Sequence, residues 1–451
     1  MKILAVRRWA DLPDAERARL LARSTAAIFE PSLMASIEAI FADVRERGDA
    51  AVVEATARFD GVALTPERMA LSTGEIDAAH AGTPVSLLDG IREAIANSRR
   101  FNEAQLSATA RDWQREVRPG FLLGERFAAI PSVGLFVPTG KASYPSVLCQ
   151  IGTPAVVAGV SEIVVVVPPV PGSTDGAVDP ATLAVARELG IERVFRANGP
   201  AAIAALTFGT ETLPRVLKVV GPGSPAVTAA QVLAQRYGTA TQMLCGPSES
   251  LLIADDSADP WRLAIDLLNE AEHGTDSAAT LVTDSAALAA AVDAAVAEQI
   301  VQLPEMRAAA ARVALSDLGG VVLVDSMDAA VAFANEYAAE HVQIATRDPE
   351  ATLEGLRFAG EALLGQDTPI GASSYTVGIP ATLPTGGYAR LNGGVTARTF
   401  LTSTSTARLS PDALAGLARP TLALADHEGF PAHANAFRLR GLADDRGNDP
   451  S

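Results

Sequence analysis

Short apolar stretches rich in β-branched residues alternate with helical stretches after residue 160, and this alternation constrains the fold most. Residues 163–167 read Ile-Val-Val-Val-Val, a run typical of a strand buried on both faces of a sheet. A series in which strands and helices alternate predicts a mostly parallel sheet with helices on its faces. The predicted elements are strands at 163–167, 193–196 and 216–220 and helices at 181–189, 201–208 and from 225 onward.

A second series of the same kind follows. With 451 residues, the chain is too long for one core. We therefore predict an α/β fold with two Rossmann-like parallel-sheet domains and small N- and C-terminal appendages. The second series has strands at 250–254, 280–283, 321–324, 341–344 and 362–365 and helices at 260–270, 286–300 and 327–339. The predicted parts are a helical arm (1–30), a discontinuous catalytic domain (31–135 and 248–395), a cofactor-binding domain (136–247) and a dimerisation tail (396–451).

The composition narrows the classes of partner. The net charge is −17 at pH 7 and is spread along the chain, which argues against nucleic acid and anionic membranes as partners because both need basic patches. The sequence has no apolar run of about 18 residues that would span a membrane. Cys149 and Cys245 lie in apolar surroundings and give no disulfide framework, and the N-terminus lacks a signal peptide, so a cytoplasmic protein is expected.

Two carboxylate–imidazole pairs are the strongest candidates for chemistry, since the chain has only five histidines. Glu270 and His273 are three residues apart, so a helix would place them on one face, where they can share a metal ion. Glu340 and His341 are adjacent, where a predicted helix ends and a strand begins, and such a pair can divide the work of general base and acid. Solvent-exposed pairs are the ordinary alternative in both places.

Gly- and Pro-rich turns follow two of the predicted strands. A strand at 128–137 leads into a turn that contains Pro138, and the strand at 216–220 leads into Gly-Pro-Gly-Ser at 221–224. Free backbone N–H groups at such turns can hold a phosphate or a substrate anion. Neither turn has the dinucleotide-binding pattern, so an ordinary tight turn is the alternative. Ser248, in a further turn, could touch substrate.

Taken together, these stretches resemble the histidinol dehydrogenase family. The similarity runs in the family's order over roughly residues 30–440. The resemblance implies a homodimer with exchanged terminal segments, NAD as cofactor, and a zinc ion that holds a small alcohol substrate. The matching motifs lie at 134–146, 154–159, 246–249, 267–277, 336–342, 383–387 and 428–433.

The resemblance also implies roles for individual residues. Glu340 would activate water, and His341 would act as acid and base. Ser248 would line the substrate pocket, and Glu428 would recognise the substrate. His433 would bind zinc in the site of the partner subunit.

The sequence departs from the family's pattern at the metal. The family's ligands are Gln, His, Asp and His, and they fall on Glu270, His273, Ser374 and His433. One carboxylate is lost and one is gained, and two His with one Glu form a known catalytic zinc set. We therefore predict that zinc is retained on Glu270, His273 and His433, with Ser374 left to contact substrate. Loss of the metal is the alternative.

The cofactor and substrate positions also differ. Three family residues that meet NAD correspond to Phe136, Ala201 and Ser224, each of which loses or shortens a hydrogen-bonding group. We predict cofactor contacts from these three and from Pro138. The family's substrate-binding His is Ala381 here, which argues against histidinol itself.

These observations predict an NAD-dependent dehydrogenase that oxidises a small alcohol or amino alcohol, through an aldehyde to the acid, at a metal-assisted site. Three alternatives remain open at this point. They are histidinol dehydrogenase proper, a dehydrogenase that needs no metal, and a non-catalytic binding protein on the same scaffold. The intact pair of Glu340 and His341 opposes the last of these.

Overall fold

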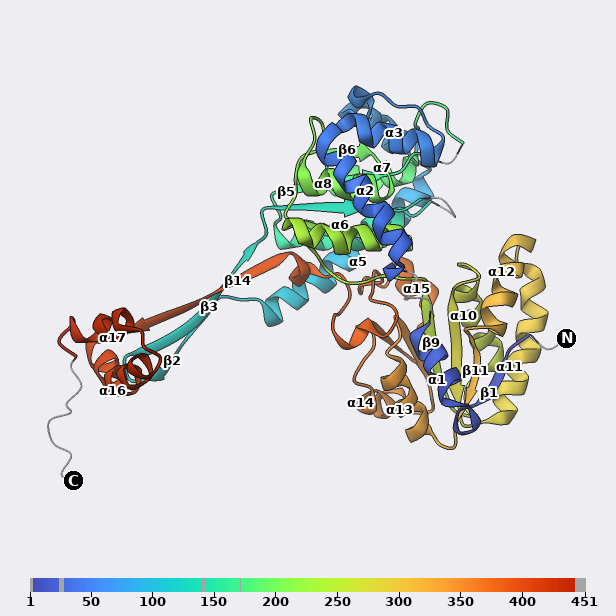
Figure 1. The fold of residues 1–451 in the computed structure, drawn as a ribbon. Helices are drawn as coiled ribbons and strands as arrows, with labels where there is room; N and C mark the ends of the chain where they lie inside the picture. The colour runs from blue at the N-terminus through green and yellow to red at the C-terminus, as the bar shows by residue number, and fades with distance from the viewer. Residues whose placement is uncertain (1–2, 24–27, 140–142, 171, 443–451) are drawn as a thin grey trace. The chain divides into compact units, whose positions relative to one another are not determined.

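The structure is a computed structural model and describes residues 3–23, 28–139, 143–170 and 172–442. The described residues divide into two compact units. The first lies within Met1–Gln105 and Ile130–Phe400, and the second within Leu106–Ala129 and Leu401–Ser451. The first unit holds two parallel sheets (Figure 1), so the predicted α/β fold is confirmed.

One sheet of the first unit has the strand order β6-β5-β4-β7-β8, with every pair parallel. The chain runs from the central strand β4 outward to β5 and β6 and then returns to pair β7 with the other edge of β4. The carboxyl ends of β4 and β7 therefore form the point where the strand order reverses, which is where sheets of this kind bind ligands. The strands are β4 (Ser132–Phe136), β5 (Glu162–Val167), β6 (Arg193–Arg196), β7 (Lys218–Val220) and β8 (Ala240–Thr241).

Helices cover both faces of this sheet. Val164 and Val166 belong to one buried apolar cluster, and Val165 and Val167 to another, because successive side chains of a strand point to opposite faces. The first face is covered by α2 (Pro31–Arg47), α3 (Asp49–Asp60), α8 (Gly199–Phe208) and α9 (Pro225–Ala234). The second face is covered by α4 (Thr73–Gly82), α5 (Val85–Thr109), α6 (Pro145–Ala158) and α7 (Pro180–Glu188).

This packing corrects the predicted place of the early helices. We predicted that residues 31–135 join the sheet built by residues 248–395. The structure instead buries Phe41 of α2 and Ile91 of α5 in the clusters around β4 and β5. Helical periodicity identifies an apolar face but does not reveal which sheet that face covers.

The other sheet of the first unit has the order β1-β11-β10-β9-β12-β13 and is also parallel throughout. The predicted arm contributes the edge strand β1 (Val6–Arg8), followed by α1 (Asp14–Ala22). The remaining strands are β9 (Glu249–Ala254), β10 (Ala278–Thr283), β11 (Gly320–Leu323), β12 (His341–Ala345) and β13 (Glu361–Leu364). The helices are α10 (Pro260–Ala271), α11 (Ala286–Gln299), α12 (Glu305–Ser316), α13 (Met327–Tyr337), α14 (Pro349–Gly355) and α15 (Ile370–Tyr375).

The second unit is an antiparallel sheet with a helix pair. The order is β14-β3-β2, built from β2 (Trp113–Arg118), β3 (Phe121–Ala129) and β14 (Leu401–Leu409). The helices are α16 (Pro411–His427) and α17 (Pro431–Arg438). The predicted strand at 128–137 is two strands, and α16 is one continuous helix with Pro420 inside.

Short 3-10 helices complete the described chain. They are η1 (Trp9–Asp11), η3 (Pro66–Arg68), η4 (Gln235–Tyr237), η5 (Ile300–Gln302), η6 (Tyr388–Arg390) and η7 (Ala397–Phe400). No helix in the described part of the chain combines the length and the apolar character needed to cross a membrane. Both cysteines are buried free thiols.

Candidate active site

A cleft of about 500 Å³ in the first unit collects most of the predicted site residues. A volume of this order suits a small substrate or part of a cofactor. Residues of both parallel sheets and of the loops around α10 and α15 line the cleft. The sheets are called here the β4–β7 sheet (β6-β5-β4-β7-β8) and the β9–β12 sheet (β1-β11-β10-β9-β12-β13). The predicted residues that line it are Pro138, Ser224, Ser248, Glu270, His273, Glu340, His341, Ser374 and Ala381.

The predicted catalytic pair lies at the amino edge of the β9–β12 sheet. Helix α13 ends at Tyr337, and β12 begins at His341, so the predicted boundary between helix and strand is confirmed. Glu249 is the first residue of β9 and Glu361 the first of β13, the two strands that flank β12. Because parallel strands begin at the same edge, these residues from distant parts of the sequence converge beside the pair.

The pair is buried and forms part of a hydrogen-bonded set. Glu340 is 8% exposed and His341 is 6% exposed. The His341 Nε2 atom lies 3.8 Å from Glu340 Oε1, and its Nδ1 atom forms a hydrogen bond with Glu361 Oε1. The hydroxyl of Ser373 donates to the same Glu361 oxygen at 2.5 Å. The imidazole is therefore fixed in orientation by a second carboxylate.

Burial and neighbouring charges shift the pKa of both groups. Burial lowers the pKa of His341, but the carboxylates of Glu340 and Glu361 outweigh it and raise the pKa to about 10. Burial raises the pKa of Glu340; the positive charge of His341 opposes this, and the carboxylates of Glu270 and Glu249 add to it. At neutral pH the imidazole therefore holds a proton, and Glu340 binds and releases a proton at higher pH than an ordinary carboxyl group.

The turn at 221–224 lies at the point where the order of the β4–β7 sheet reverses. Gly221 has a φ of +143°, and a Cβ atom there would collide with the carbonyl oxygen of Phe136. Ser224 caps α9 by accepting the N–H of Val227 at 3.5 Å. Backbone at this turn can approach a ligand closely, at the amino end of a helix.

Two of the predicted cofactor residues are core residues. Phe136 and Ala201 are each 2% exposed and belong to the same apolar cluster. Neither is among the residues that line the cleft. The prediction that their side chains contact the cofactor is therefore not supported by this arrangement, whereas Pro138 and Ser224 do line the cleft.

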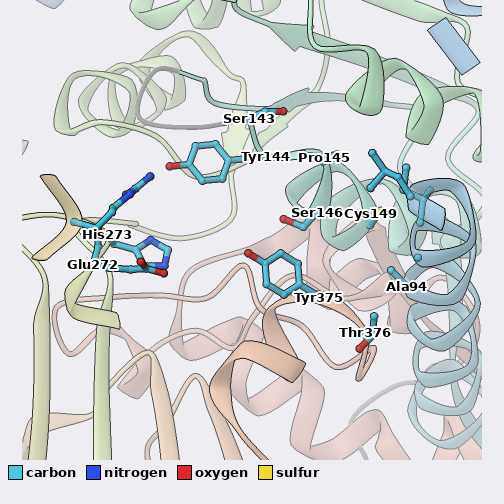
Figure 2. A pocket seen from close by; sticks show the side chains of 14 residues that line it. Ala94, Ser143, Tyr144, Pro145, Ser146, Cys149, Glu272, His273, Tyr375 and Thr376 are labelled. Atoms are coloured by element: carbon cyan, nitrogen blue, oxygen red, sulfur yellow. The ribbon is translucent and has the colours of Figure 1, made fainter. Parts of the chain in front are cut away.

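A second pocket of about 380 Å³ adjoins the cleft and shares five lining residues with it, which are Tyr144, Ser146, Glu272, His273 and Tyr375. Its remaining wall is largely apolar and includes Ala94 of α5. Figure 2 shows the hydroxyl groups of Tyr144 and Tyr375 directed toward the side that carries Glu272 and His273. The pocket can therefore take the non-reacting part of a molecule whose reactive end lies in the cleft.

Comparisons with known proteins assign the family. The histidinol dehydrogenase family model matches residues 24–441. The chain belongs to the histidinol dehydrogenase family. Among similar relatives, the histidinol dehydrogenase of Methanosarcina barkeri (strain Fusaro / DSM 804) is 38% identical over 98% of each chain. That of Rhizobium meliloti (strain 1021) is 43% identical over 90% of this chain and 91% of its own. A histidinol dehydrogenase homolog of Colwellia psychrerythraea (strain 34H / ATCC BAA-681) is 38% identical over 96% of this chain and 95% of its own.

A solved structure agrees with this assignment. The crystal structure of histidinol dehydrogenase from Elizabethkingia anophelis matches with a TM-score of 0.91 and 32% identity, over 98% of both chains. Proteins of the histidinol dehydrogenase family are NAD-dependent oxidoreductases, so the predicted family and the coarse class of activity are confirmed.

Two of the residues predicted to bind the family's zinc, Glu270 and His273, line the cleft. Glu270 is 2% exposed, and its Oε1 atom has no hydrogen-bond partner among the described residues, which suits a cation. His273 lies just beyond α10, which ends at Ala271, and it is exposed. The hydroxyl of Ser374 donates to the carbonyl of Ile370 at 3.1 Å. No group of three or more His, Cys, Asp or Glu side chains is arranged for a metal within the described ranges.

Glu270 and His273 both line the cleft and are donor types that zinc accepts, but a catalytic zinc site needs at least three protein ligands. The predicted donor is His433, on α17 of the second unit, and the predicted substrate contact Glu428 is the residue that follows α16 in the same unit. Both are exposed. Their roles stay predictions.

Sequence reasoning missed several polar residues of the site. Glu249 and Glu361 are buried at 2% and 7% exposure, each at the start of a strand. Gln150 of α6 accepts the N–H of Ala381 at 3.0 Å and so holds the backbone of the segment that was predicted to contact substrate. A charged residue that opens an otherwise apolar strand is the signal that would have found the two carboxylates.

Proposed function

We propose that the chain oxidises a small amino alcohol through an aldehyde to the acid with NAD, using Glu340 and His341. The observation that supports this most directly is the buried set of Glu340, His341 and Glu361 at one wall of the cleft. The turn at 221–224, on the opposite sheet, lines the same cleft. The groups proposed to transfer protons and the turn proposed to hold the cofactor therefore line the same cleft.

The two catalytic groups take different roles because of their protonation. His341, held protonated by two carboxylates, is the group suited to donate a proton or to stabilise a developing negative charge on oxygen. Glu340 is the group suited to accept a proton, first in the oxidation of the alcohol and then from the water that adds to the aldehyde. Glu361 touches the imidazole at Nδ1 and thereby directs Nε2 toward the cleft side of the pair.

The turn at 221–224 and Pro138 are the residues that would hold the nicotinamide cofactor. The close packing of Gly221 on the end of β4, and the start of α9 beside it, fit a pyrophosphate group. NAD, when bound, supplies the acceptor for the hydride. Zinc, when bound to Glu270, His273 and His433, would supply a positive charge that holds the polar end of the substrate.

Histidinol is the first candidate substrate. Relatives at 38% and 43% identity that carry the name histidinol dehydrogenase align over at least 90% of this chain. One observation favours a second candidate, a different small amino alcohol. Ala381 lines the cleft but offers no side-chain hydrogen bond where the family has His, and a site built to bind an imidazole discriminates through such polar contacts.

The test is to supply purified protein with NAD and then with histidinol or a panel of other small amino alcohols, each with and without added zinc. Histidinol turnover in excess of the panel identifies the first candidate, and preference for another alcohol identifies the second. Activity that chelators do not reduce would indicate a dehydrogenase without metal. If no alcohol reduces NAD or NADP and neither cofactor binds, the proposal fails. The remaining alternative is then a non-catalytic binding protein.

We further propose that the second unit completes the site of a partner copy. Large apolar side chains in or next to its helices are exposed, with Leu424 at 63%, Phe430 at 52% and Leu439 at 87%, which suits a covered interface. Mixing Glu270→Ala with His433→Ala protein tests this. In a two-fold dimer that shares ligands, random mixing should restore about a quarter of the wild-type metal sites, because half the dimers are mixed and each has one intact site. If mixing restored no metal sites, His433 would not be a ligand in the partner's site.

A further inference from the structure

A buried ion pair of Arg23 and Glu249 contacts the proposed base, Glu340, and has no part in the chemistry described above. Arg23, at the end of α1, and Glu249, at the start of β9, have side chains that are each 2% exposed. Arg23 Nε lies 2.5 Å from Glu249 Oε2. The guanidinium group also donates to the carbonyl of Tyr337 at 2.9 Å and stacks over the Tyr337 ring at 3.9 Å.

The second oxygen of Glu249 is directed at the segment that carries the base. Glu249 Oε1 accepts the backbone N–H of Glu340 at 3.2 Å and that of Gly386 at 3.1 Å. In return, the backbone N–H of Glu249 donates to Glu340 Oε2 at 3.1 Å. The two glutamates thus exchange hydrogen bonds between the side chain of each and the backbone of the other.

Stability alone is a weak reason for such a pair. Removing two charges from water is costly, and well-packed apolar side chains of similar size often replace a buried ion pair without loss of stability. The reciprocal bonds have a more specific effect, because they fix both the backbone of Glu340 and one oxygen of its carboxylate. The other oxygen, Oε1, is the one that faces His341.

We propose that Glu249 is a positioning residue for Glu340 and that Arg23 holds Glu249 in place. The inference rests on the proposed function of Glu340 as the base. It also gives the N-terminal arm a role at the site, since β1 and α1 bring Arg23 to the amino edge of the β9–β12 sheet. A base held in this way needs no reorganisation before it accepts a proton.

The test uses two variants that differ in one property. Arg23→Met/Glu249→Gln removes both charges but keeps an amide oxygen that can accept the two N–H groups. Arg23→Met/Glu249→Met has nearly the same shape and no such acceptor. Neither variant leaves a buried charge without its partner, so both are expected to fold, and their unfolding temperatures verify this.

The first readout is acid formation with NAD, with histidinol as the first probe. A displacement of about 1 Å in a catalytic group costs on the order of 100-fold in rate. We therefore expect kcat for acid formation to be at least about tenfold lower in the Met variant than in the Gln variant, with KM for the alcohol within about twofold. The proposal would be overturned if the two variants had equal kcat values. It would also be overturned if the Met variant differed from the Gln variant by the same factor in kcat and in KM.

The second readout does not depend on turnover. Amide hydrogen exchange at Glu340 and Gly386 should be at least about tenfold faster in the Met variant than in the Gln variant, while the amides of Gln343 and Ile344 exchange alike. If no alcohol is oxidised but this difference is found, the proposed function fails and the positioning contact stands. If the two variants exchange alike at all four amides, the positioning contact is wrong.

Discussion

The first residues of two neighbouring strands, His341 of β12 and Glu361 of β13, are register partners and share a hydrogen bond through Nδ1 and Oε1. Backbone pairing thus sets the orientation of the imidazole. A strand register is difficult to alter by small movements, because a slip by one residue would turn every side chain to the opposite face. The register therefore keeps Glu361 beside His341, where its carboxylate can orient the imidazole.

Glu361→Gln tests the electrostatic part of this contact. The amide keeps an acceptor for the imidazole but removes the charge, so the pKa of His341 should fall below its value of about 10. Because the pKa of His341 is raised in the folded state, the contact between His341 and Glu361 contributes fully to folding stability below about pH 6.5. This contribution is lost as the pH rises through about 10. Titration of the His341 ring by NMR measures the shift. Glu188→Gln, beside His80 instead, should leave His341 unchanged.

Glu340→Gln should separate the two oxidations. Removing a general base typically costs about 100-fold or more in rate, and we expect that loss in acid formation, with aldehyde accumulating. The ratio of NADH to alcohol consumed and trapping of the aldehyde measure this. In the wild type, burial raises the pKa of Glu340 above its ordinary value of 4.5, so activity should fall as the pH falls through that raised pKa. If the Glu340→Gln variant formed acid at the wild-type rate, Glu340 would not be the general base.

Glu270→Ala should abolish stoichiometric metal in protein purified without chelator, because Glu270 is a proposed ligand whose buried Oε1 atom has no hydrogen-bond partner among the described residues. Elemental analysis measures this. Glu272→Ala is the matched control, since Glu272 lines the same cleft and is only partly buried, and it should keep the metal. Full metal content in Glu270→Ala would show that Glu270 is not a ligand.

Ala381→His should favour histidinol. The new imidazole restores a polar contact on the cleft wall, and contacts of this kind are worth at least about tenfold in kcat/KM. Ala381→Phe controls for the added volume, since it has no ring nitrogen, and should not improve turnover. Steady-state kinetics with histidinol decide. A fall in kcat/KM with both variants would mean that the site needs the small side chain.

Gly221→Ala should disturb the proposed cofactor turn. The added Cβ would meet the carbonyl oxygen of Phe136 at a φ of +143°, and we expect a loss of about 3 kcal/mol together with a higher KM for NAD. Gly190 has a φ of +70° and open space around it, so Gly190→Ala should cost only about 1 kcal/mol and leave KM unchanged. Urea unfolding and cofactor titration compare the two variants. Equal effects would contradict the close approach at Gly221.

The local pattern of the sequence determined most elements of the two parallel sheets. The strand predicted at 193–196 is β6, and the helix predicted at 260–270 is α10 with one further residue. Such segments are identifiable because buried strands and amphipathic helices repeat their apolar residues at fixed intervals. The hairpin of β2 and β3 was missed, since every residue of Trp113–Arg118 is exposed and no apolar alternation marks it.

The sequence by itself also identified the pair of Glu340 and His341, because the two residues are adjacent in the chain. It could not find their supporting groups. Glu249 and Glu340 are 91 residues apart, and His341 and Glu361 are 20 apart. Only the parallel pairing of β9, β12 and β13 brings them to one edge of a sheet. Local residue patterns report the conformation of nearby backbone, whereas the pKa and orientation of a buried group depend on whatever the tertiary fold places around it.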